Sequence, residues 1–514
     1  MPTMRSSSSP AECDLLIVGG GINGTGIARD AAGRGLTVIL CEQDDLASHT
    51  SSASSKLIHG GLRYLEYLEF GLVRKALRER ELLLRSAPHI IRPLRFVMPH
   101  VKNGRPAWMI RAGLFLYDHL ARRRLLSGSQ SIDLRQHAAG TPLKSEFNRG
   151  FIYSDAWVDD ARLVVLNAID AREKGARILT RCRCESAAWN DGLWRIVLRD
   201  HNRDTNIVHA RCLVNAAGPW AQHFLQTATH RHMPRSLRLV KGSHIVVKRL
   251  FDHADAYIFQ HTDGRIVFAL PYEHDFTLIG TTETDFRGDP GRLEIDPQEV
   301  GYLCDLANRY FRRSIGATDV LWSYSGVRPL VEDASSSASA VTRDYRLGLD
   351  TTHGPVLSVL GGKITTFRML AEQAVDMLAP SLGNHQRAWT ANACLPGGDI
   401  FGAVPSNRAV LEFDHYIDAL QGQYPWLPRP LIARYARAYG SRIHVLLQNR
   451  SCVADMGTEI AAGLFAAEVD YWSAHEWAVN AEDMLWRRSK LGLHLPADTQ
   501  DNLDSWLVTH RFDR

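Results

Sequence analysis

Residues 14–42 constrain the fold of this chain more than any other stretch. An apolar run at 15–18 is long enough for a buried parallel strand, and a helical pattern at about 22–32 and a second apolar run at 37–40 follow it. Between the first run and the helix, three glycines stand in the spacing G-x-G-x-x-G: Gly19, Gly21 and Gly24. This order predicts a strand–turn–helix–strand unit that binds a dinucleotide.

Each marked residue of this unit has a physical role. Gly19 permits a tight turn, Gly21 lets the backbone approach a pyrophosphate, and Gly24 lets the helix pack close to the strand. The N–H groups at the helix N-terminus would then face the anion. Glu42 follows Gly24 by eighteen residues, where an acid accepts a ribose hydroxyl and disfavours a cofactor with a 2′-phosphate. The motif does not choose between FAD and NAD.

The composition is that of a large globular protein, and 514 residues predict two or three domains. The eight cysteines show neither metal-ligand spacing nor a disulfide framework, so we expect no metal site and a reducing compartment. Residues 1–12 carry consecutive serines and no apolar core, which predicts a disordered tail and not a signal peptide. No run of about eighteen apolar residues occurs, so no membrane-spanning helix is expected.

The net charge of +4 is unevenly distributed. Residues 89–132 hold eight arginines and lysines against one acid, Asp118. Within them, 106–126 has the pattern of a helix with apolar and aromatic residues, and its end carries the arginines of 122–124. Such a helix could enter a membrane interface, with its arginines at anionic headgroups. A core helix with basic residues at its C-terminus fits equally well, and both interpretations remain open.

Three further stretches are expected to meet the ligand. Residues 46–61 are small and polar and would lie flat against a large planar ligand, with a surface loop as the alternative. The strand at 207–214 ends in an Ala-Gly turn at 217–218 and should share a sheet with the first strand. The strand at 356–360 runs into Gly-Gly-Lys at 361–363, a second glycine-to-helix anion site.

A second domain must be interleaved with the dinucleotide-binding domain. Strand-like runs predict an antiparallel sheet for it, at 244–247, 257–259, 265–270 and 277–280. Residues 332–340 form a serine-rich loop. We assign 13–398 to the dinucleotide domain in segments of about 13–90, 155–222 and 340–398, with the substrate domain interleaved at about 91–154 and 223–339. Residues 399–514, rich in Ala, Leu, Arg and Trp, predict a separate helical domain without catalytic residues.

Five motifs resemble those of a known family. They are Asp-Ala-Ala-Gly-Arg-Gly at 30–35, Ser-Ser-Ala-Ser-Ser-Lys-Leu-Ile-His-Gly-Gly-Leu-Arg-Tyr at 51–64, Lys-Gly-Ser-His at 241–244, Ser-Gly-Val-Arg-Pro at 325–329 and Gly-Gly-Lys-Ile-Thr at 361–365. Together they resemble the FAD-dependent glycerol-3-phosphate dehydrogenases, and most of all the respiratory, aerobic bacterial type. The block at 51–64 is far more specific than a general flavoprotein motif.

The resemblance implies an α/β fold. A Rossmann-type FAD-binding domain like that of the amino-acid oxidases would carry an inserted antiparallel-sheet substrate domain and an all-helical C-terminal domain. The resemblance also implies non-covalent FAD, oxidation of sn-glycerol 3-phosphate to dihydroxyacetone phosphate by hydride transfer from C2 to the flavin, and electron transfer to membrane ubiquinone. The residues expected to bind FAD are Gly19, Gly21, Ile22, Asn23, Gly24, Glu42, Gln43, Ser51, Ser52, Ser54, Ser55, Lys56, His59, Gly60, Gly61, Ala217, Gly218, Gly361, Gly362, Lys363 and Thr365.

The same motifs carry the expected substrate residues. A bidentate guanidinium suits a phosphate best, so we assign Arg63 and Arg328 to the substrate phosphate. His244 is the expected base for the C2 hydroxyl, because neutral imidazole accepts a proton near pH 7, and orienting the substrate is its alternative role. Tyr64 would line the substrate pocket, and Thr365 would contact substrate or flavin.

Lys363 joins His244 and Arg328 as an expected catalytic residue. With the helix N-terminus that follows Gly361 and Gly362, its charge would stabilise negative charge on the reduced flavin.

Three rival functions remain open. An oxidase of the same fold would pass electrons to oxygen, and an amine or amino-acid oxidase would need a carboxylate clamp, which two arginines also supply. A nucleic-acid-binding flavoprotein could use the basic segment, but its apolar content favours lipid, so we expect no nucleic acid. We expect a cytoplasmic protein held peripherally on the cytoplasmic face of the inner membrane through 89–132. Its oligomeric state, a homodimer included, stays open.

Overall fold

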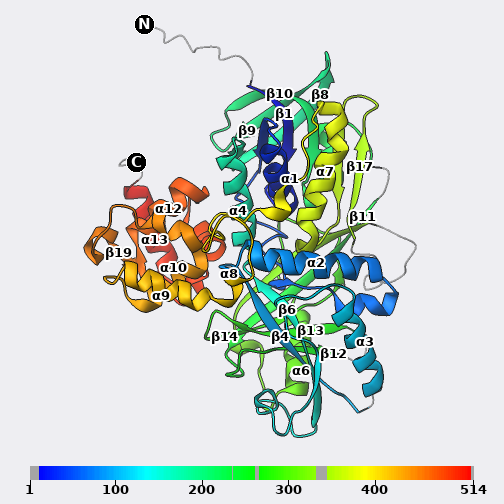
Figure 1. Cartoon of the computed structure of the whole chain (residues 1–514). Helices are drawn as coiled ribbons and strands as arrows, with labels where there is room; N and C mark the ends of the chain where they lie inside the picture. The colour runs from blue at the N-terminus through cyan, green and yellow to red at the C-terminus, as the bar shows by residue number, and fades with distance from the viewer. Residues whose placement is uncertain (1–10, 103, 234–235, 261–264, 332–343, 511–514) are drawn as a thin grey trace.

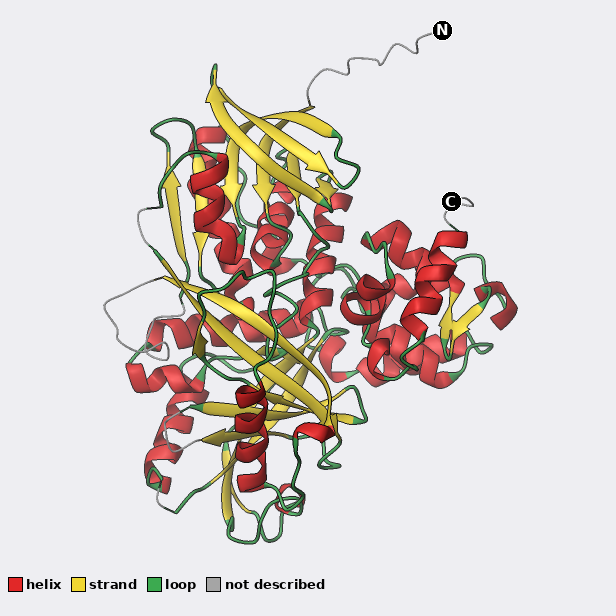
Figure 2. Cartoon of the chain, turned by 180° about the vertical axis from the view of Figure 1, so that it is seen from behind, coloured by secondary structure: helices red, strands yellow, loops and turns green. Residues whose placement is uncertain are grey.

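The computed structural model describes residues 11–102, 104–233, 236–260, 265–331 and 344–510. Two sheets and a group of C-terminal helices make up this part of the chain (Figure 1). The sheet that contains the first strand lies at one end, the second sheet lies at the other, and the C-terminal helices pack to one side (Figure 2).

The first sheet is built around β1 (Ala11–Val18), whose residues Leu15, Leu16 and Ile17 are fully buried. β1 pairs in parallel with β2 (Val38–Cys41) and with β10 (Thr205–Asn215), which confirms that the distant strand at 207–214 shares its sheet. The order is β17-β18-β10-β1-β2-β7, with β9 beside β10 and β8 beside β9. The remaining strands are β7 (Arg177–Leu179), β8 (Cys182–Asn190), β9 (Leu193–Asp200), β17 (Arg346–Asp350) and β18 (Val356–Leu360).

Three helices form the layer next to this sheet. α1 (Ile22–Gly33) packs against α4 (Asp160–Glu173) and α7 (Phe367–Leu382). Their apolar side chains join those of β1 and β2 in one core cluster. Because a parallel sheet is covered by helices, its central strands are apolar on both faces, as the run at 15–18 predicts.

The second sheet has ten strands in the described residues, in the order β15-β11-β14-β13-β12-β4-β6-β3, with β16 beside β11 and β5 beside β6. Its pairs are antiparallel except for β4 with β12, so the predicted antiparallel sheet is confirmed apart from that pair. The strands are β3 (Leu57–Ile58), β4 (Ile91–Pro99), β5 (Gln130–Asp133), β6 (Arg149–Val158), β11 (Leu237–Lys248), β12 (Ala256–Gln260), β13 (Ile266–Tyr272), β14 (Phe276–Gly280), β15 (Thr284–Asp285) and β16 (Val320–Val331). The short α5 (Ala221–Ala228) follows β10, and α6 (Pro297–Tyr310) begins with a capping box formed by Asp296 and Glu299.

Several predicted extents differ from the structure. Ala11 and Glu12, assigned to the tail, belong to β1, because pairing with β10 extends that strand. The predicted domain boundary after 154 falls inside β6. Residues 57–58, in the first segment of the dinucleotide domain, pair with β6 of the second sheet. Residues 1–10 of the predicted tail and the whole serine-rich loop at 332–340 lie outside the described residues.

α3 (Ala107–His119) ends earlier than the predicted helix at 106–126, so the arginines of 122–124 lie beyond its C-terminus. One side of α3 is buried through Leu114 and Tyr117. The other side exposes Trp108, Met109, Phe115 and Leu116. α3 lies beside α2 (Phe70–Ser86) at the edge of the molecule (Figure 1). None of the helices in the described residues is long and apolar enough to cross a membrane.

The C-terminal region forms its own core of apolar side chains between 413 and 507. Its helices are α8 (Arg408–Leu411), α9 (Phe413–Gln423), α10 (Arg429–Tyr439), α11 (Ile443–Leu446), α12 (Ala466–Glu476) and α13 (Thr499–Thr509), with a π-helix at Asp483–Arg488. The prediction of an all-helical domain is wrong in one detail, since β19 (Glu459–Ala461) and β20 (Leu464–Phe465) form a small hairpin.

Buried ion pairs join the C-terminal region to the rest of the chain. Arg488 donates to both carboxylate oxygens of Asp45, at 2.6 and 2.8 Å, and Arg487 donates to Asp45 at 2.8 Å. Arg162 of α4 pairs with Glu476 of α12. Burial raises the pKa of Asp45, but Arg488 and Arg487 outweigh it and hold that pKa below its ordinary value.

We expect Asp45→Asn to lower the free energy of unfolding by about 3 kcal/mol, because the buried Arg488 loses its bidentate carboxylate, whereas Arg487 keeps Glu482 and Asp483. Asp418→Asn breaks an exposed pair with Arg429 and should cost at most about 1 kcal/mol. Thermal and denaturant unfolding measure both. The contribution of Asp45 should be complete above about pH 4 and be lost as the pH falls further, since its folded-state pKa is lowered. An Asp45→Asn protein as stable as the Asp418→Asn protein would contradict the role of this pair.

Candidate functional site

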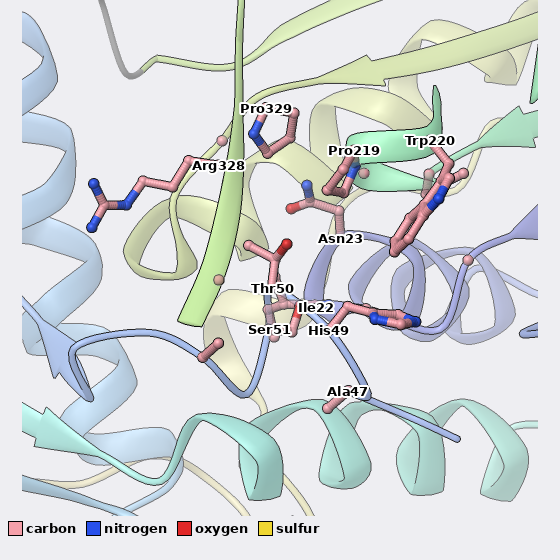
Figure 3. Close-up of a pocket in the computed structure, with 18 of the residues that line it drawn as sticks. Ile22, Asn23, Ala47, His49, Thr50, Ser51, Pro219, Trp220, Arg328 and Pro329 are labelled. Carbon is pink, nitrogen blue, oxygen red and sulfur yellow. Dashed lines mark hydrogen bonds between the residues drawn. The ribbon is translucent and has the colours of Figure 1, made fainter. Parts of the chain in front are cut away.

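A cavity of about 700 Å³ opens between the two sheets. The carboxyl ends of β1, β2, β10 and β18 reach it from the first sheet, and β11, β13 and β16 reach it from the second. This edge of a doubly wound sheet is where such folds hold ligands. Figure 3 shows Arg328 at one side of the cavity and Trp220 with His49 at the other, with Asn23 and Thr50 between them.

The glycine turn after β1 has the close approaches that its spacing predicts. A Cβ on Gly19, where φ is +114°, would lie 2.5 Å from the carbonyl oxygen of Ala216, and a Cβ on Gly24 would collide with the carbonyl oxygen of Gly19. At Gly19 and Gly24, β1, α1 and β10 therefore approach too closely for a side chain to fit. Gly19, Gly21, Ile22 and Asn23 line the cavity, whereas Gly24 is a packing residue behind it.

Glu42 lies at the end of β2, as predicted, and lines the cavity with Gln43. Its Oε2 accepts the N–H of Gly20 at 2.6 Å, and its Oε1 accepts the N–H of Asp44 at 2.9 Å. Burial raises the pKa of Glu42, and these N–H groups partly offset the shift. The carboxylate keeps further lone pairs with which it can accept a ribose hydroxyl.

The two predicted anion sites lie next to each other. The Asn23 amide, in the first turn of α1, donates to the carbonyl oxygen of Gly361 at 3.3 Å. Gly361, Gly362 and Lys363 line the cavity. One part of the prediction is wrong here: Lys363 is extended, a 3-10 turn follows at Ile364–Thr366, and α7 begins only at Phe367. The glycines therefore do not open directly into an α-helix.

The polar stretch at 46–61 lines the cavity through several of its residues. Ser51 Oγ accepts the N–H of Ile22 at 3.0 Å, and Thr50 Oγ1 donates to the carbonyl oxygen of Val327 at 2.7 Å. The stretch thus ties α1 to β16 across the cavity. The predicted FAD residues that line the cavity are Gly19, Gly21, Ile22, Asn23, Glu42, Gln43, Ser51, Ser54, Ser55, His59, Ala217, Gly218, Gly361, Gly362, Lys363 and Thr365.

Lys56 and Ser52 do not line the cavity. The Lys56 ammonium is fully buried and lies 2.8 Å from both carboxylate oxygens of Asp160, at the start of α4. Burial lowers the pKa of Lys56, and Asp160 opposes the shift. Ser52 Oγ donates to the carbonyl oxygen of His49 at 3.2 Å. Both side chains stabilise the stretch from within, so their assignment to the ligand is corrected.

Gly60 and Gly61 are corrected in the same way. A Cβ on Gly60 would lie 2.5 Å from the Tyr117 hydroxyl, and the Gly60 N–H donates to that hydroxyl at 2.9 Å. Tyr117 in turn donates to the buried Asp155. Gly61, with φ of +79°, turns the chain into the short helix η1 (Leu62–Tyr67). The glycines are needed for packing against α3 and for this turn.

Arg63 of η1 and Arg328 of β16 come together as predicted, although Arg63 does not itself line the cavity. Each guanidinium lies near the same carboxylate: Arg63 Nη1 is 3.7 Å and Arg328 Nη1 is 3.6 Å from the oxygens of Glu283. A Cβ on Gly242 would lie 2.8 Å from Arg328 Nη2, so the glycine of the Lys-Gly-Ser-His motif makes room for this guanidinium.

Lys363 and Tyr64 meet beside this pair. The Lys363 ammonium lies 3.6 Å from the centre of the Tyr64 ring, and both residues line the cavity. Thr365 is buried, and its Oγ1 accepts the N–H of His59 at 3.2 Å. Cations from three distant segments, Arg63, Arg328 and Lys363, therefore gather at one end of the cavity.

His244 lies behind the cavity wall and is 1% exposed. Its Nε2 is 2.9 Å from the hydroxyl of Ser55, which does line the cavity, and its ring stacks on Tyr324 at 4.7 Å. The ring fits only because Gly280 faces it, where a Cβ would collide with it. Burial lowers the pKa of His244 well below 6.5, and the charges of Arg328 and Lys56 lower it further.

Several lining residues escape the sequence analysis. His49 and Trp220 pack edge to face at 4.6 Å, and the side of the cavity near Glu42 includes Cys182 and Cys184 of β8. Trp220 stands two residues after the predicted Ala-Gly turn, which is the sequence pattern that could have indicated it. In the part of the chain that the structure describes, no three His, Cys, Asp or Glu side chains are grouped to hold a metal ion.

The site fits a flavin dinucleotide. The backbone is bare at Gly19 and Gly21, a carboxylate stands at the end of β2, and the cavity continues from there to the cationic end. Glycine backbone suits a pyrophosphate and the carboxylate suits a ribose, so the residues present match the two ends of such a cofactor.

Comparisons with known proteins agree with this geometry. The profile of the family described as FAD dependent oxidoreductase matches residues 14–368. The chain is 53% identical to a glycerol-3-phosphate dehydrogenase of Pseudomonas aeruginosa, over 96% of this chain and 94% of that one. It is 49% identical to a D-erythritol 1-phosphate dehydrogenase of Brucella abortus, over 95% of this chain and 96% of that one.

A solved structure is also similar over nearly the whole length. The X-ray structure of the glycerol-3-phosphate dehydrogenase from Bacillus halodurans complexed with FAD has a TM-score of 0.78 and 27% identity, and the match covers 97% of this chain and 90% of that one. The family profile makes FAD the cofactor of this chain. The chain belongs to the FAD-dependent oxidoreductases and, within them, to the glycerol-3-phosphate dehydrogenase family.

Proposed function

We propose that this protein oxidises sn-glycerol 3-phosphate to dihydroxyacetone phosphate. The observation that carries the proposal is the convergence of Arg63 and Arg328 on Glu283 beside the FAD cavity, whose wall includes Arg328 and Lys363. A phosphomonoester is a dianion, and guanidinium groups bind its oxygens in pairs. The 53% identical relative, which is named a glycerol-3-phosphate dehydrogenase, supports the same substrate.

The remaining steps are assigned to residues around this end. Bound FAD supplies the hydride acceptor for C2 of the substrate. Arg63 and Arg328 hold the phosphate, Tyr64 bounds the pocket, and Lys363 places positive charge where electron density accumulates. The FAD is held without a covalent bond by the residues of the glycine turn and the 46–61 stretch.

Removal of the proton from the C2 hydroxyl is assigned to His244 acting through Ser55. The imidazole does not line the cavity, but the Ser55 hydroxyl does and is 2.9 Å from Nε2. Ser55 can accept the substrate proton while its own proton passes to the imidazole. A lowered pKa keeps His244 neutral throughout the physiological range.

We propose that the electrons pass to ubiquinone in a membrane that the protein binds at its surface. An apolar patch on η1, α2 and α3 supports this: Leu68 is 72%, Trp108 70% and Phe115 58% exposed. The other members of the patch are Tyr67, Phe70, Met109 and Leu116. Exposed aromatic and aliphatic side chains in one patch are typical of surfaces that enter a bilayer interface.

Several basic residues of 89–132 have partners within the protein, so not all of them can bind a membrane. Arg92 stacks on Trp157, Arg111 bonds Ser129, and Arg123 pairs with Asp118. Arg105 is exposed but pairs with Glu66. Lys102, Arg122 and Arg124 remain exposed, and anionic headgroups are their proposed partners. Attachment to the cytoplasmic face of the inner membrane and a homodimer stay predictions.

The function is tested by anaerobic flavin bleaching. Glycerol 3-phosphate should bleach the flavin of the holoenzyme, and D-erythritol 1-phosphate, the substrate named for one relative, should do so at least about tenfold less efficiently. Arg328→Met should keep the flavin spectrum and lower kcat/KM by about 100-fold or more, because one charged clamp of the phosphate is lost. A protein bleached only by the erythritol ester, or by amino acids, would overturn the substrate. Turnover with oxygen but not with a quinone analogue would overturn the acceptor.

The His244–Ser55 relay makes a second prediction. At saturating substrate, the rate of flavin reduction should stay flat between pH 6 and 8, because a His244 pKa below that range keeps the imidazole neutral. His244→Asn and Ser55→Ala should each slow reduction by about 100-fold or more, and together no further than the slower one alone. Stopped-flow spectroscopy measures these rates. Additive losses, or full activity of Ser55→Ala, would rule out the relay.

Membrane attachment makes a third prediction. The double change Trp108→Ser with Phe115→Ser should weaken binding to phosphatidylglycerol-containing vesicles by about tenfold or more, because two large apolar side chains no longer enter the interface. Leu411→Ser, an equally exposed change far from the patch, is the control. Co-sedimentation with the vesicles across a salt series measures the affinity of the double variant and of the control. A parallel measurement with RNA tests the alternative that this surface binds nucleic acid. Unchanged vesicle binding, or tighter binding to RNA, would contradict the surface assignment.

A further inference from the structure

Glu283 lies between the two arginines of the phosphate clamp. Its carboxylate oxygens are 3.7 Å from Arg63 Nη1 and 3.6 Å from Arg328 Nη1, and its side chain is 9% exposed. Glu283 stands in a short turn between β14 and β15, and no sequence motif around it indicates a site residue. A buried carboxylate at the point where two guanidinium groups converge stands where an anionic ligand would bind.

The chain on the N-terminal side of Glu283 is anchored. Thr282 Oγ1 donates to Glu299 of α6 at 2.7 Å and accepts the N–H of Ser243 at 2.9 Å. Thr281 Oγ1 accepts from Arg328 Nη2 at 3.4 Å. Lys241 pairs with the other oxygen of Glu299 at 2.7 Å. The backbone before Glu283 is thus fixed to β11 and α6, while its carboxylate extends toward the arginines.

The two ion pairs of Glu283 are long. Charge-assisted hydrogen bonds between guanidinium and carboxylate have lengths of about 2.7–2.9 Å, and Arg488 with Asp45 shows such lengths in this same chain. The contacts of Glu283 at 3.6 and 3.7 Å therefore hold the charge near the arginines without the directed bonds of a tight pair. A phosphate, with three oxygens and two charges, can form those bonds.

We propose that Glu283 is the resident counter-anion of the phosphate clamp and that substrate phosphate displaces it. This inference rests on the proposed function. Without a ligand, Glu283 contributes negative charge beside both guanidinium groups. When the ester binds, the carboxylate gives up both arginines and turns toward the solvent-accessible side of the turn.

The exchange raises the affinity that any anionic ligand needs, because displacing Glu283 costs every ligand the same free energy. A dianion recovers more of that cost than a monoanion, since it offers twice the charge to the same two guanidinium groups. Glu283 thus sets an affinity threshold that dianionic phosphomonoesters pass and that carboxylates and monoanionic sulfate esters do not.

The test is Glu283→Gln in the FAD-loaded enzyme, with inorganic phosphate as the probe. Phosphate binding is read from the shift it causes in the flavin absorption spectrum, so no turnover is needed. The Kd of phosphate should fall by about tenfold, equivalent to about 1.4 kcal/mol, because the neutral amide no longer competes. The Kd of methyl sulfate, a monoanion, should fall by a similar factor, because the same internal competitor is removed for both anions.

Two controls make the result specific. Asp285→Asn removes a nearby exposed carboxylate that pairs with Arg238, and it should change neither Kd. Glu283→Asp keeps the charge on a shorter side chain and should lower both Kd values less than Glu283→Gln does.

An unchanged or raised phosphate Kd in Glu283→Gln would overturn the proposal, as would an equal fall of that Kd in Asp285→Asn. If Glu283 instead bound the substrate hydroxyls, Glu283→Gln would raise the KM for the ester and leave the Kd of phosphate unchanged, which also overturns it. Failure of the proposed function has a different result: wild-type flavin would not bleach with glycerol 3-phosphate, whatever the two anions do.

Discussion

The close approach of β1, α1 and β10 is the constraint on which the rest of this structure depends. Gly24 lies against the carbonyl of Gly19, and Gly19 lies against Ala216, so any side chain at either glycine would separate the three elements. Their meeting places the ends of the parallel strands side by side. The loops that leave those ends then share one cavity, although they come from segments about two hundred residues apart.

Charge organises the far end of the same cavity. Arg63, Arg328 and Lys363 come from three segments, and each would be costly to bury alone. Glu283 and the Tyr64 ring lie within reach of these cations. The polar wall between the two ends is stabilised in turn by Lys56 and Asp160, a buried pair that faces away from the ligand. Binding groups therefore stay available because other charges in the same stretch hold the backbone.

Much of this arrangement could be predicted from the sequence, and the reason is local. The G-x-G-x-x-G turn, the acid at the end of β2 and the Ala-Gly turn after β10 are short-range patterns with a fixed geometric meaning, and the structure places all three at the cavity. The block at 51–64 identified Arg63 and Tyr64 by resemblance. The strand extents and the late start of α7 were missed because sheet pairing, which the sequence does not show, decides them.

The residues that sequence reasoning misassigned have partners far away in the chain. Lys56 has the composition of a ligand residue, but Asp160, more than a hundred positions later, takes its ammonium. Gly60 looks like a flat surface for a flavin, but Tyr117 of α3 occupies the space beside it. Glu283 has no local sequence pattern that indicates a site residue, because only folding brings it between two arginines.

The C-terminal region shows most clearly that contacts between distant parts of the chain could not be predicted from the sequence. Its sequence contains no catalytic pattern, and it contributes no residue to the cavity wall among those described. Yet Arg487 and Arg488 close around Asp45, two residues before Ala47, which lines the cavity. A guanidinium pair more than four hundred positions later therefore fixes the start of the stretch that runs along the FAD. The helical region thus holds the backbone beside the cavity through this buried ionic contact.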